Sequence, residues 1–129
     1  MNGRPLYVYV CAPMTGMPGE YLANINQMSL LSRQLIDLDL CPINPAGDLL
    51  EGIVSSTPLS DAAYKRRSME LLQLLGLLPK GQAAVYVVAT KHRNGSVSAG
   101  VSAEIVEAMS LKIPVVYDVG SLLAVRAEA

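Results

Sequence analysis

The sequence predicts an open, mainly parallel α/β sheet of four to five strands, with helices on both faces. Short runs rich in β-branched residues alternate with longer stretches whose apolar residues recur every three or four positions, a pattern typical of strands that alternate with helices. The run 83–89, AAVYVVA, is apolar throughout, as expected for a central parallel strand buried on both faces. No repeat or low-complexity tract interrupts this alternation, and right-handed crossovers are expected to join the strands.

Four strands are expected. Residues 6–11 are β-rich and are followed by Pro13 and Gly16, so the first strand should end near residue 12. Residues 40–45 contain two prolines and predict a short strand near a sheet edge. The remaining strands are expected at 83–89 and 113–117.

Four helices are expected between and after these strands. The first covers 21–36, and its apolar positions are Leu22, Ile25, Met28, Leu31 and Leu35. The second covers 62–75, after Thr57 as an N-cap and Pro58, and ends near Gly76. The third covers 99–111 with one apolar face, made of Val101, Ile105, Ala108 and Met109. A short last helix is expected at 121–126.

Composition limits the class of protein. The chain has 129 residues, 51% of them hydrophobic and 16% charged, which predicts one folded domain over 1–129. It contains six Tyr, no Phe and no Trp, and its net charge is −1. Because base-stacking platforms and a basic face are both missing, a nucleic-acid duplex is not an expected partner, whereas a single nucleotide is.

Targeting and metal signals are weak. The apolar run 71–78 is followed by Pro79 and Lys80 and is too short to span a membrane, and 5–12 is too short and β-branched for a signal peptide. A cytoplasmic protein without membrane contact is therefore expected.

Cys11 and Cys41 lack C-x-x-C spacing, so we expect reduced thiols and no metal site.

The candidate site lies where the strands end. Ligands of open parallel sheets bind beyond the carboxyl ends of the strands, which here lead into the loops 12–18, 44–48 and 90–98. The small-residue segment 98–104, SAGVSAE, leads from the last of these loops into a helix. Small residues allow close approach of a ligand, and a helix start attracts anions. Glu104, expected in the first helical turn, is the candidate nucleophile, kept ionised by the helix dipole.

Three segments resemble the nucleoside 2-deoxyribosyltransferase superfamily. Tyr9-Val10-Cys11-Ala12-Pro13-Met14-Thr15-Gly16 resembles its strand-one motif. Ser98-x-Gly100-x-x-x-Glu104, with Ala108 and Ile113-Pro114-Val115, resembles its catalytic helix. Tyr64-Lys65-Arg66-Arg67-Ser68 resembles its intermediate segment. Together these matches span most of the chain and predict the family's Rossmann-like or flavodoxin-like fold.

The resemblance implies roles for individual residues. Glu104 would attack the anomeric carbon of a ribosyl or deoxyribosyl group, with Tyr9 near the sugar or base. The substrate would be bound by residues of all three segments: Ala12, Pro13, Met14, Thr15, Gly16, Ser68, Ser98 and Gly100. By this resemblance, the position of Ser98 is a Ser in nucleoside 5′-monophosphate N-glycosidases and an Asp in deoxyribosyltransferases. The Ser of this chain therefore favours a nucleotide substrate. No metal or organic cofactor is implied, and a homodimer or higher homo-oligomer is.

One departure from the family leaves the function open. The family has an Asp where this chain has Ser68, and Glu70 is about 200° away around a helix. The main hypothesis is hydrolysis of a nucleoside 5′-monophosphate to free base and sugar phosphate. The alternatives are deoxyribosyl transfer between bases and a non-catalytic nucleotide-binding module.

Simpler roles also fit individual residues. Glu104 can be a solvated helix residue, Ser98 a plain N-cap, Tyr9 a core residue and Gly16 a turn residue. The segment 91–93, KHR, is either a phosphate-contacting lid or a solvated loop. Asn44 and Asp48 either reach the ligand or cap turns.

Overall fold

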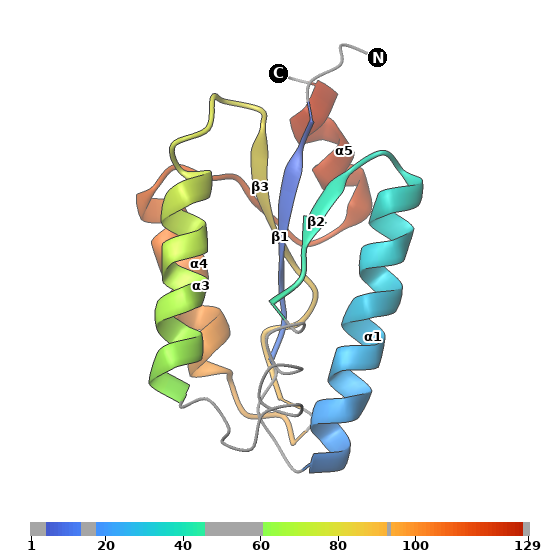
Figure 1. Cartoon of the computed structure of the whole chain (residues 1–129), viewed down its shortest axis with the longest axis vertical. Coiled ribbons are helices and arrows are strands. Elements are labelled where there is room, and N and C mark those ends of the chain that lie inside the picture. The colour runs from blue at the N-terminus through green and yellow to red at the C-terminus, as the bar shows by residue number, and fades with distance from the viewer. Residues whose placement is uncertain (1–4, 14–17, 46–60, 93, 128–129) are drawn as a thin grey trace.

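The fold is an open four-stranded sheet in which all strands run parallel (Figure 1). A computed structural model describes residues 5–13, 18–45, 61–92 and 94–127. The strand order is β2-β1-β3-β4. β1 (Tyr7–Cys11) and β3 (Ala83–Val87) occupy the centre, and β2 (Cys41–Ile43) and β4 (Val115–Val116) lie at the edges. The predicted α/β Rossmann-like architecture is confirmed, including a central strand, which covers 83–87 of the expected 83–89, and an edge strand that contains Pro42.

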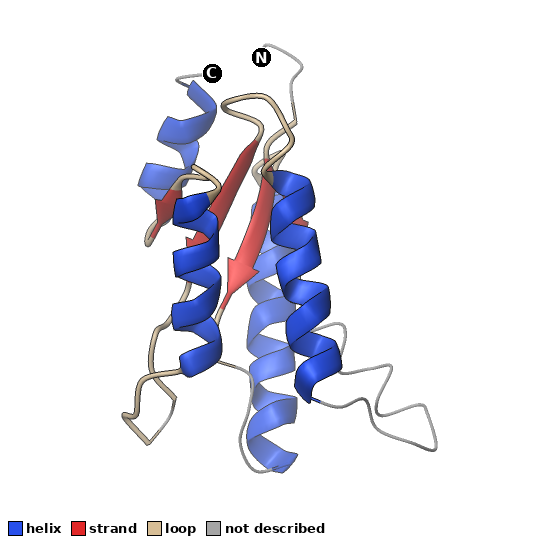
Figure 2. Cartoon of the chain, turned by 90° about the vertical axis from the view of Figure 1, so that its left-hand side faces the viewer, coloured by secondary structure: helices blue, strands red, loops and turns tan. Residues whose placement is uncertain are grey.

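Helices cover both faces of this sheet. α1 (Pro18–Asp37) and α5 (Val119–Ala127) pack on one face, and α3 (Asp61–Leu75) and α4 (Ala99–Ser110) pack side by side on the other (Figures 1 and 2). Each face has its own apolar core. Within the described part of the chain, no helix is both long and apolar enough to cross a membrane.

The two cores divide the residues of β1 between them. Val8 and Val10 lie in the core under α1 and α5, whereas Tyr9 and Cys11 lie in the core under α3 and α4. This follows from the two-residue period of a strand, which sends neighbouring side chains to opposite faces. β1 pairs with β3 over its whole length, from Tyr7 opposite Ala83 to Cys11 opposite Val87. Both central strands therefore end at the same level.

Some element boundaries differ from the predictions. β4 is shorter than the expected 113–117, because Ile113 N donates to Ala108 O and so still closes the end of α4. α5 is longer than the expected 121–126, and Asp118 Oδ1 accepts from Ser121 N at 2.7 Å near its start. The predicted N-cap Thr57 lies outside the described residues.

The predicted buried face of α4 was wrong at one position. Val101 and Ala108 are buried and Ile105 packs against the same core, but Met109 is 65% exposed. One residue further along a helix is about 100° further around it, so Met109 leaves the stripe that Ala108 occupies.

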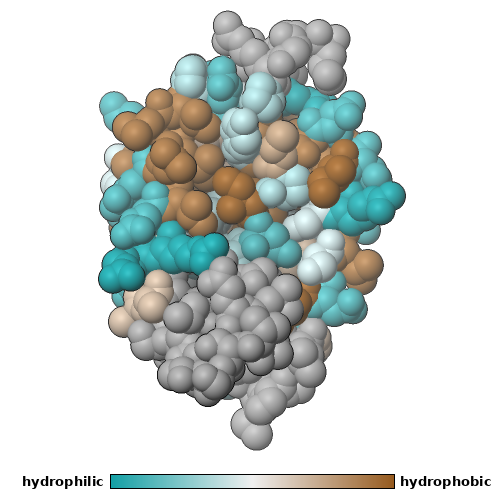
Figure 3. Space-filling view, viewed as in Figure 1, coloured by the Kyte–Doolittle hydropathy of each residue, from teal (hydrophilic) through white to brown (hydrophobic). Residues whose placement is uncertain are grey.

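Apolar side chains also reach the surface. Figure 3 shows them interspersed with hydrophilic residues on the face seen in Figure 1. The large exposed ones are Leu30, Ile36, Leu38, Leu74, Leu77, Val97, Val106, Met109 and Tyr117. Exposed apolar residues are ordinary on folded proteins, because polar atoms do not suffice to cover the surface.

Candidate active site

The candidate site lies where the two central strands end. β1 leads to α1 on one face of the sheet, whereas β3 leads to α4 on the other face. The chain thus diverges between neighbouring strands, and such a switch point is where ligands bind in open α/β sheets. The strands remain joined just beyond their ends, since Val88 N donates to Cys11 O at 2.8 Å.

Ser98 caps the helix that begins at this switch point. Its backbone is extended, and its Oγ accepts from Val101 N at 3.2 Å. The side chain is buried, with 4% of the residue exposed. The N-cap role expected for Ser98 is confirmed. A hydroxyl that accepts one hydrogen bond keeps its own proton to donate, so a phosphate contact is compatible with the cap.

The loop that leads into this cap is an ordered turn. Thr90 O accepts from Ser98 N at 2.9 Å, and Lys91 and Val97 form an antiparallel bridge. At the tip, Gly95 adopts a positive φ of 87°, a conformation that glycine adopts at no steric cost. Asn94 Oδ1 accepts from Ser96 N at 2.9 Å. These bonds fix the approach to α4 at the carboxyl end of β3.

Glu104 lies deeper in α4 than predicted. The helix begins at Ala99, so Glu104 is its sixth residue and belongs to the second turn rather than the first. The helix dipole acts mainly within the first turn, and the expectation that it keeps Glu104 ionised is wrong. Burial instead raises the pKa of the Glu104 carboxyl. The alternative of a solvated Glu is also wrong, since Glu104 Oε2 is buried.

Two side chains of β1 face this carboxyl. Tyr9 and Cys11 are 0% and 1% exposed. Burial raises the pKa of both groups, and the nearby Glu104 charge raises each further. Both side chains thus stay protonated and are able to donate to the carboxyl. Their interaction with Glu104 in turn lowers its pKa, partly offsetting the effect of its burial.

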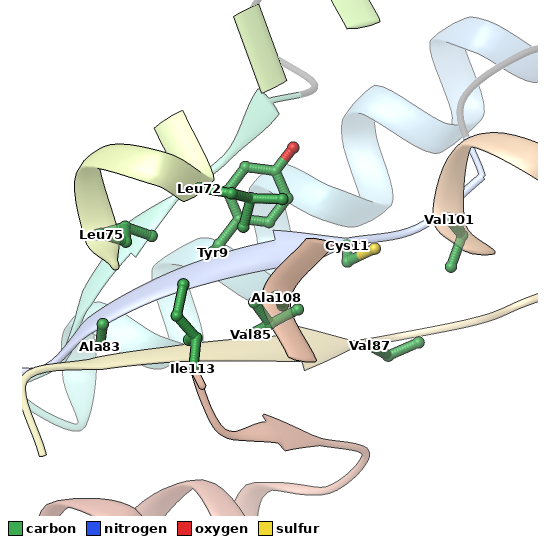
Figure 4. Packing of buried hydrophobic residues seen from close by; sticks show 10 residues of the cluster. All are labelled: Tyr9, Cys11, Leu72, Leu75, Ala83, Val85, Val87, Val101, Ala108 and Ile113. Atoms are coloured by element: carbon green, nitrogen blue, oxygen red, sulfur yellow. The ribbon is translucent and has the colours of Figure 1, made fainter. Parts of the chain in front are cut away.

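These contacts are loose. Within the described part of the chain, neither the Tyr9 hydroxyl nor Glu104 Oε2 has a hydrogen-bond partner at full bonding geometry. Buried polar groups are nearly always paired, and exceptions are common at functional sites. Figure 4 shows buried residues of the core that contains Tyr9 and Cys11, among them Leu72 of α3 and Val101 of α4. The Tyr9 hydroxyl therefore lies in a largely apolar surrounding.

α3 contributes Ser68 to the same place. Ser68 is half-buried, and its side chain interacts with the Tyr9 hydroxyl and lowers the pKa of Tyr9. Glu70, two residues on, is exposed and lies 3.9 Å from Arg66. The prediction that Glu70 points away from the site is confirmed. Ser68 thus lies beside Tyr9, on the helix that covers this face of the sheet.

The remaining predicted residues divide by location. The Ala12 side chain packs against the opposite core, so only its backbone can face a ligand on the side of Tyr9. Pro13 is buried just beyond β1, and Gly100 is exposed at the start of α4. Met14, Thr15 and Gly16 lie outside the described residues. Asn44 is half-buried after β2, and Asp48 is outside the described part.

Sequence reasoning missed Cys11 as a member of the site. The sequence predicts only a reduced thiol at this position, although the two-residue period of a strand places Cys11 on the same face as Tyr9. In residues 5–13, 18–45, 61–92 and 94–127, no group of three or more His, Cys, Asp and Glu side chains could hold a metal ion. The chemistry within reach is that of one buried carboxyl flanked by two weak donors.

Comparison with known proteins adds no further identification. No family model matches this chain, and no curated protein matches it.

Proposed function

We propose that this protein hydrolyses the N-glycosidic bond of a nucleoside 5′-monophosphate, releasing the free base and the sugar 5-phosphate. The observation that carries the proposal is the Glu104 carboxyl beside the Tyr9 hydroxyl, whose Oε2 is buried without a hydrogen-bond partner among the residues that the structure describes. It lies near the switch point of the sheet, where ligands of such folds bind. The three motifs that resemble the nucleoside 2-deoxyribosyltransferase superfamily supply the substrate class.

The reaction proceeds in two displacements at the anomeric carbon. In the first, an oxygen of ionised Glu104 bonds to C1′ while the bond from C1′ to the base nitrogen breaks, and its electron pair stays on the base. The base then takes a proton from water. In the second, water bonds to C1′, the ester bond to Glu104 breaks, and the water gives up a proton to solvent. Two inversions retain the configuration at C1′.

The carboxylate also acts electrostatically. Positive charge builds on the sugar as the glycosidic bond breaks, and a fixed anion in a buried site stabilises that charge more than it would in water. Because burial raises the pKa of Glu104, the ionised form is reactive but costly to maintain. Tyr9, which stays protonated, orients the carboxylate and offsets part of that cost.

The start of α4 is the proposed phosphate site. Helix geometry leaves the N–H groups of Ala99 and Gly100 without intrahelical partners, and both residues are exposed. Such N–H groups bind phosphate. The Ser98 hydroxyl keeps a proton to donate there, whereas an Asp would repel the phosphate.

The test is base release from a panel of nucleosides and their 5′-monophosphates, followed by chromatography. We expect free base from a monophosphate in water alone, and no base release by Glu104→Gln. Glu70→Gln is the matched control, because Glu70 is an exposed carboxylate that pairs with Arg66, and it should retain full activity. Base release only when an acceptor base is supplied would indicate deoxyribosyl transfer. Release by Glu104→Gln at the wild-type rate refutes the proposed nucleophile.

A second candidate function is a nucleotide-binding module without turnover. Ser68 favours it, because the residue beside Tyr9 cannot serve as the acid that protonates a leaving base. Calorimetric titration with each monophosphate distinguishes the two functions. Binding that survives Glu104→Gln, with no base released by the wild type, supports the module. Base release that Glu104→Gln abolishes while binding is retained excludes it.

A further inference from the structure

We propose that Cys11 is a positioning residue for Glu104, holding the carboxyl from the end of β1 while Tyr9 holds it from the middle of that strand. This inference rests on the proposed function for its catalytic consequence. Its structural content, a thiol that steers the carboxyl of a neighbouring helix, can be measured without any substrate.

The geometry of β1 supports this role. Tyr9 and Cys11 are two positions apart, so their side chains leave the same face of the sheet roughly 7 Å from each other. Both belong to the apolar core that contains Val101. Val101 precedes Glu104 by three positions on α4, and residues so spaced share one side of a helix. The Glu104 Oε2 is buried, and the carboxyl interacts with both the Tyr9 phenol and the Cys11 thiol, so it lies near this stretch of β1.

Burial limits the Cys11 thiol to contacts inside the protein core. Cys11 is 1% exposed and is not in a disulfide. Among the described residues, the titratable groups that affect the thiol or are affected by it are Glu104 and Tyr9. A polar atom buried in an apolar core without a partner costs free energy, and the carboxyl is the group that the thiol can donate to.

A thiol suits a nucleophilic carboxylate better than a hydroxyl does. It is a weak donor and packs as a small apolar group, so it excludes water and orients the carboxylate without binding the reactive electron pair strongly. A hydroxyl at the same position stabilises the anion more and reduces its reactivity. A methyl group offers no donor and lets the carboxyl turn.

The first measurement is the titration of Glu104 itself. Protein labelled with ¹³C at the Glu side-chain carboxyl is titrated by NMR, and the Glu104 signal is assigned by its loss in Glu104→Gln. Relative to wild type, we expect Cys11→Ala to raise the Glu104 pKa and Cys11→Ser to lower it. Cys41→Ala is the matched control, a free cysteine on β2, and should leave the titration unchanged.

The second measurement is the rate of base release. Cys11→Ala should lower kcat about two- to fivefold, the effect of one lost weak hydrogen bond, with KM nearly unchanged and the pH profile shifted upward. Cys11→Ser should restore most of the lost rate and shift the profile downward.

The outcomes separate the two proposals. If Glu104 titrates identically in wild type, Cys11→Ala and Cys11→Ser, the role of Cys11 is refuted, whatever the activities are. If the titrations shift as expected but wild type releases no base, the proposed function is refuted and the contact stands. Cys11→Ser has nearly the size of the native side chain, so it decides the titration arm if Cys11→Ala does not fold.

Discussion

Glu104→Gln is expected to make the protein more stable at neutral pH, although it removes the proposed nucleophile. Among the described residues, Glu104 Oε2 has no partner at full bonding geometry, although it is buried. An unsatisfied buried acceptor costs about 1–3 kcal/mol, and more when it is charged. Donation from Tyr9 and Cys11 offsets part of this cost. A neutral amide of the same shape should therefore raise the free energy of unfolding by about 1–2 kcal/mol.

The gain should depend on pH in a defined direction. The folded-state pKa of Glu104 is raised above its unfolded value, so the folded protein binds more protons than the unfolded chain between the two values. Wild-type stability then falls as pH rises above roughly 4.3, the ordinary pKa of Glu. Gln does not titrate, so the advantage of the variant should be smallest near pH 4 and largest above the raised pKa.

Urea unfolding of wild type and Glu104→Gln at pH 4, 6 and 8 measures this difference. Its full size corresponds to a rise in Tm of about 4–7 °C for a domain of this length. Glu70→Gln, which replaces an exposed carboxylate paired with Arg66, is the control and should change the free energy of unfolding by less than about 1 kcal/mol. A variant that is less stable than wild type at pH 8, or an advantage of equal size at all three pH values, contradicts the reasoning.

Three further substitutions test other parts of the structure. Ser98→Asp should keep the helix cap and change the free energy of unfolding by less than about 0.5 kcal/mol. In titration calorimetry it should weaken the binding of monophosphates and leave the binding of nucleosides unchanged. An equal loss of affinity for both ligands refutes the phosphate site. Leu72→Ala, fully buried against Tyr9, should lower the free energy of unfolding by about 2–5 kcal/mol in urea, and a loss under 1 kcal/mol would place Leu72 outside the core. Gly95→Ala meets no atom within 4 Å but must hold a φ of 87°, so it should cost about 1 kcal/mol by thermal unfolding, whereas no cost would mean that the turn relaxes.

The architecture could be predicted because each strand and helix has a local signal. The apolar run at 83–89 indicated a central strand, and Pro42 and Pro45 indicated an edge. The ends were less predictable. Lys112 adopts a positive φ of 61°, and the main-chain bond from Ile113 to Ala108 closes the helix. Neither feature has a periodic signature, so β4 was predicted too long.

The site was predictable in its members more than in its electrostatics. Tyr9, Ser68 and Glu104 lie on three different elements, and three motifs of the sequence contain them. In the structure, Tyr9 interacts with both Ser68 and Glu104. The environment of Glu104 depends on where α4 begins and on what covers the carboxyl, which are properties of the tertiary packing. The sequence therefore suggested an exposed anion at a helix start, whereas the structure has a buried one in the second turn.

The alternation along β1 gives protein engineers a route to a sturdier protein. Val8 and Val10 face α1 and α5 and share no core with Tyr9 or Cys11. Mutant libraries confined to the core under α1 and α5 can be screened for heat resistance alone, because Glu104, Tyr9 and Cys11 lie on the other face of the sheet. Libraries in the core under α3 and α4 need a screen for ligand binding as well.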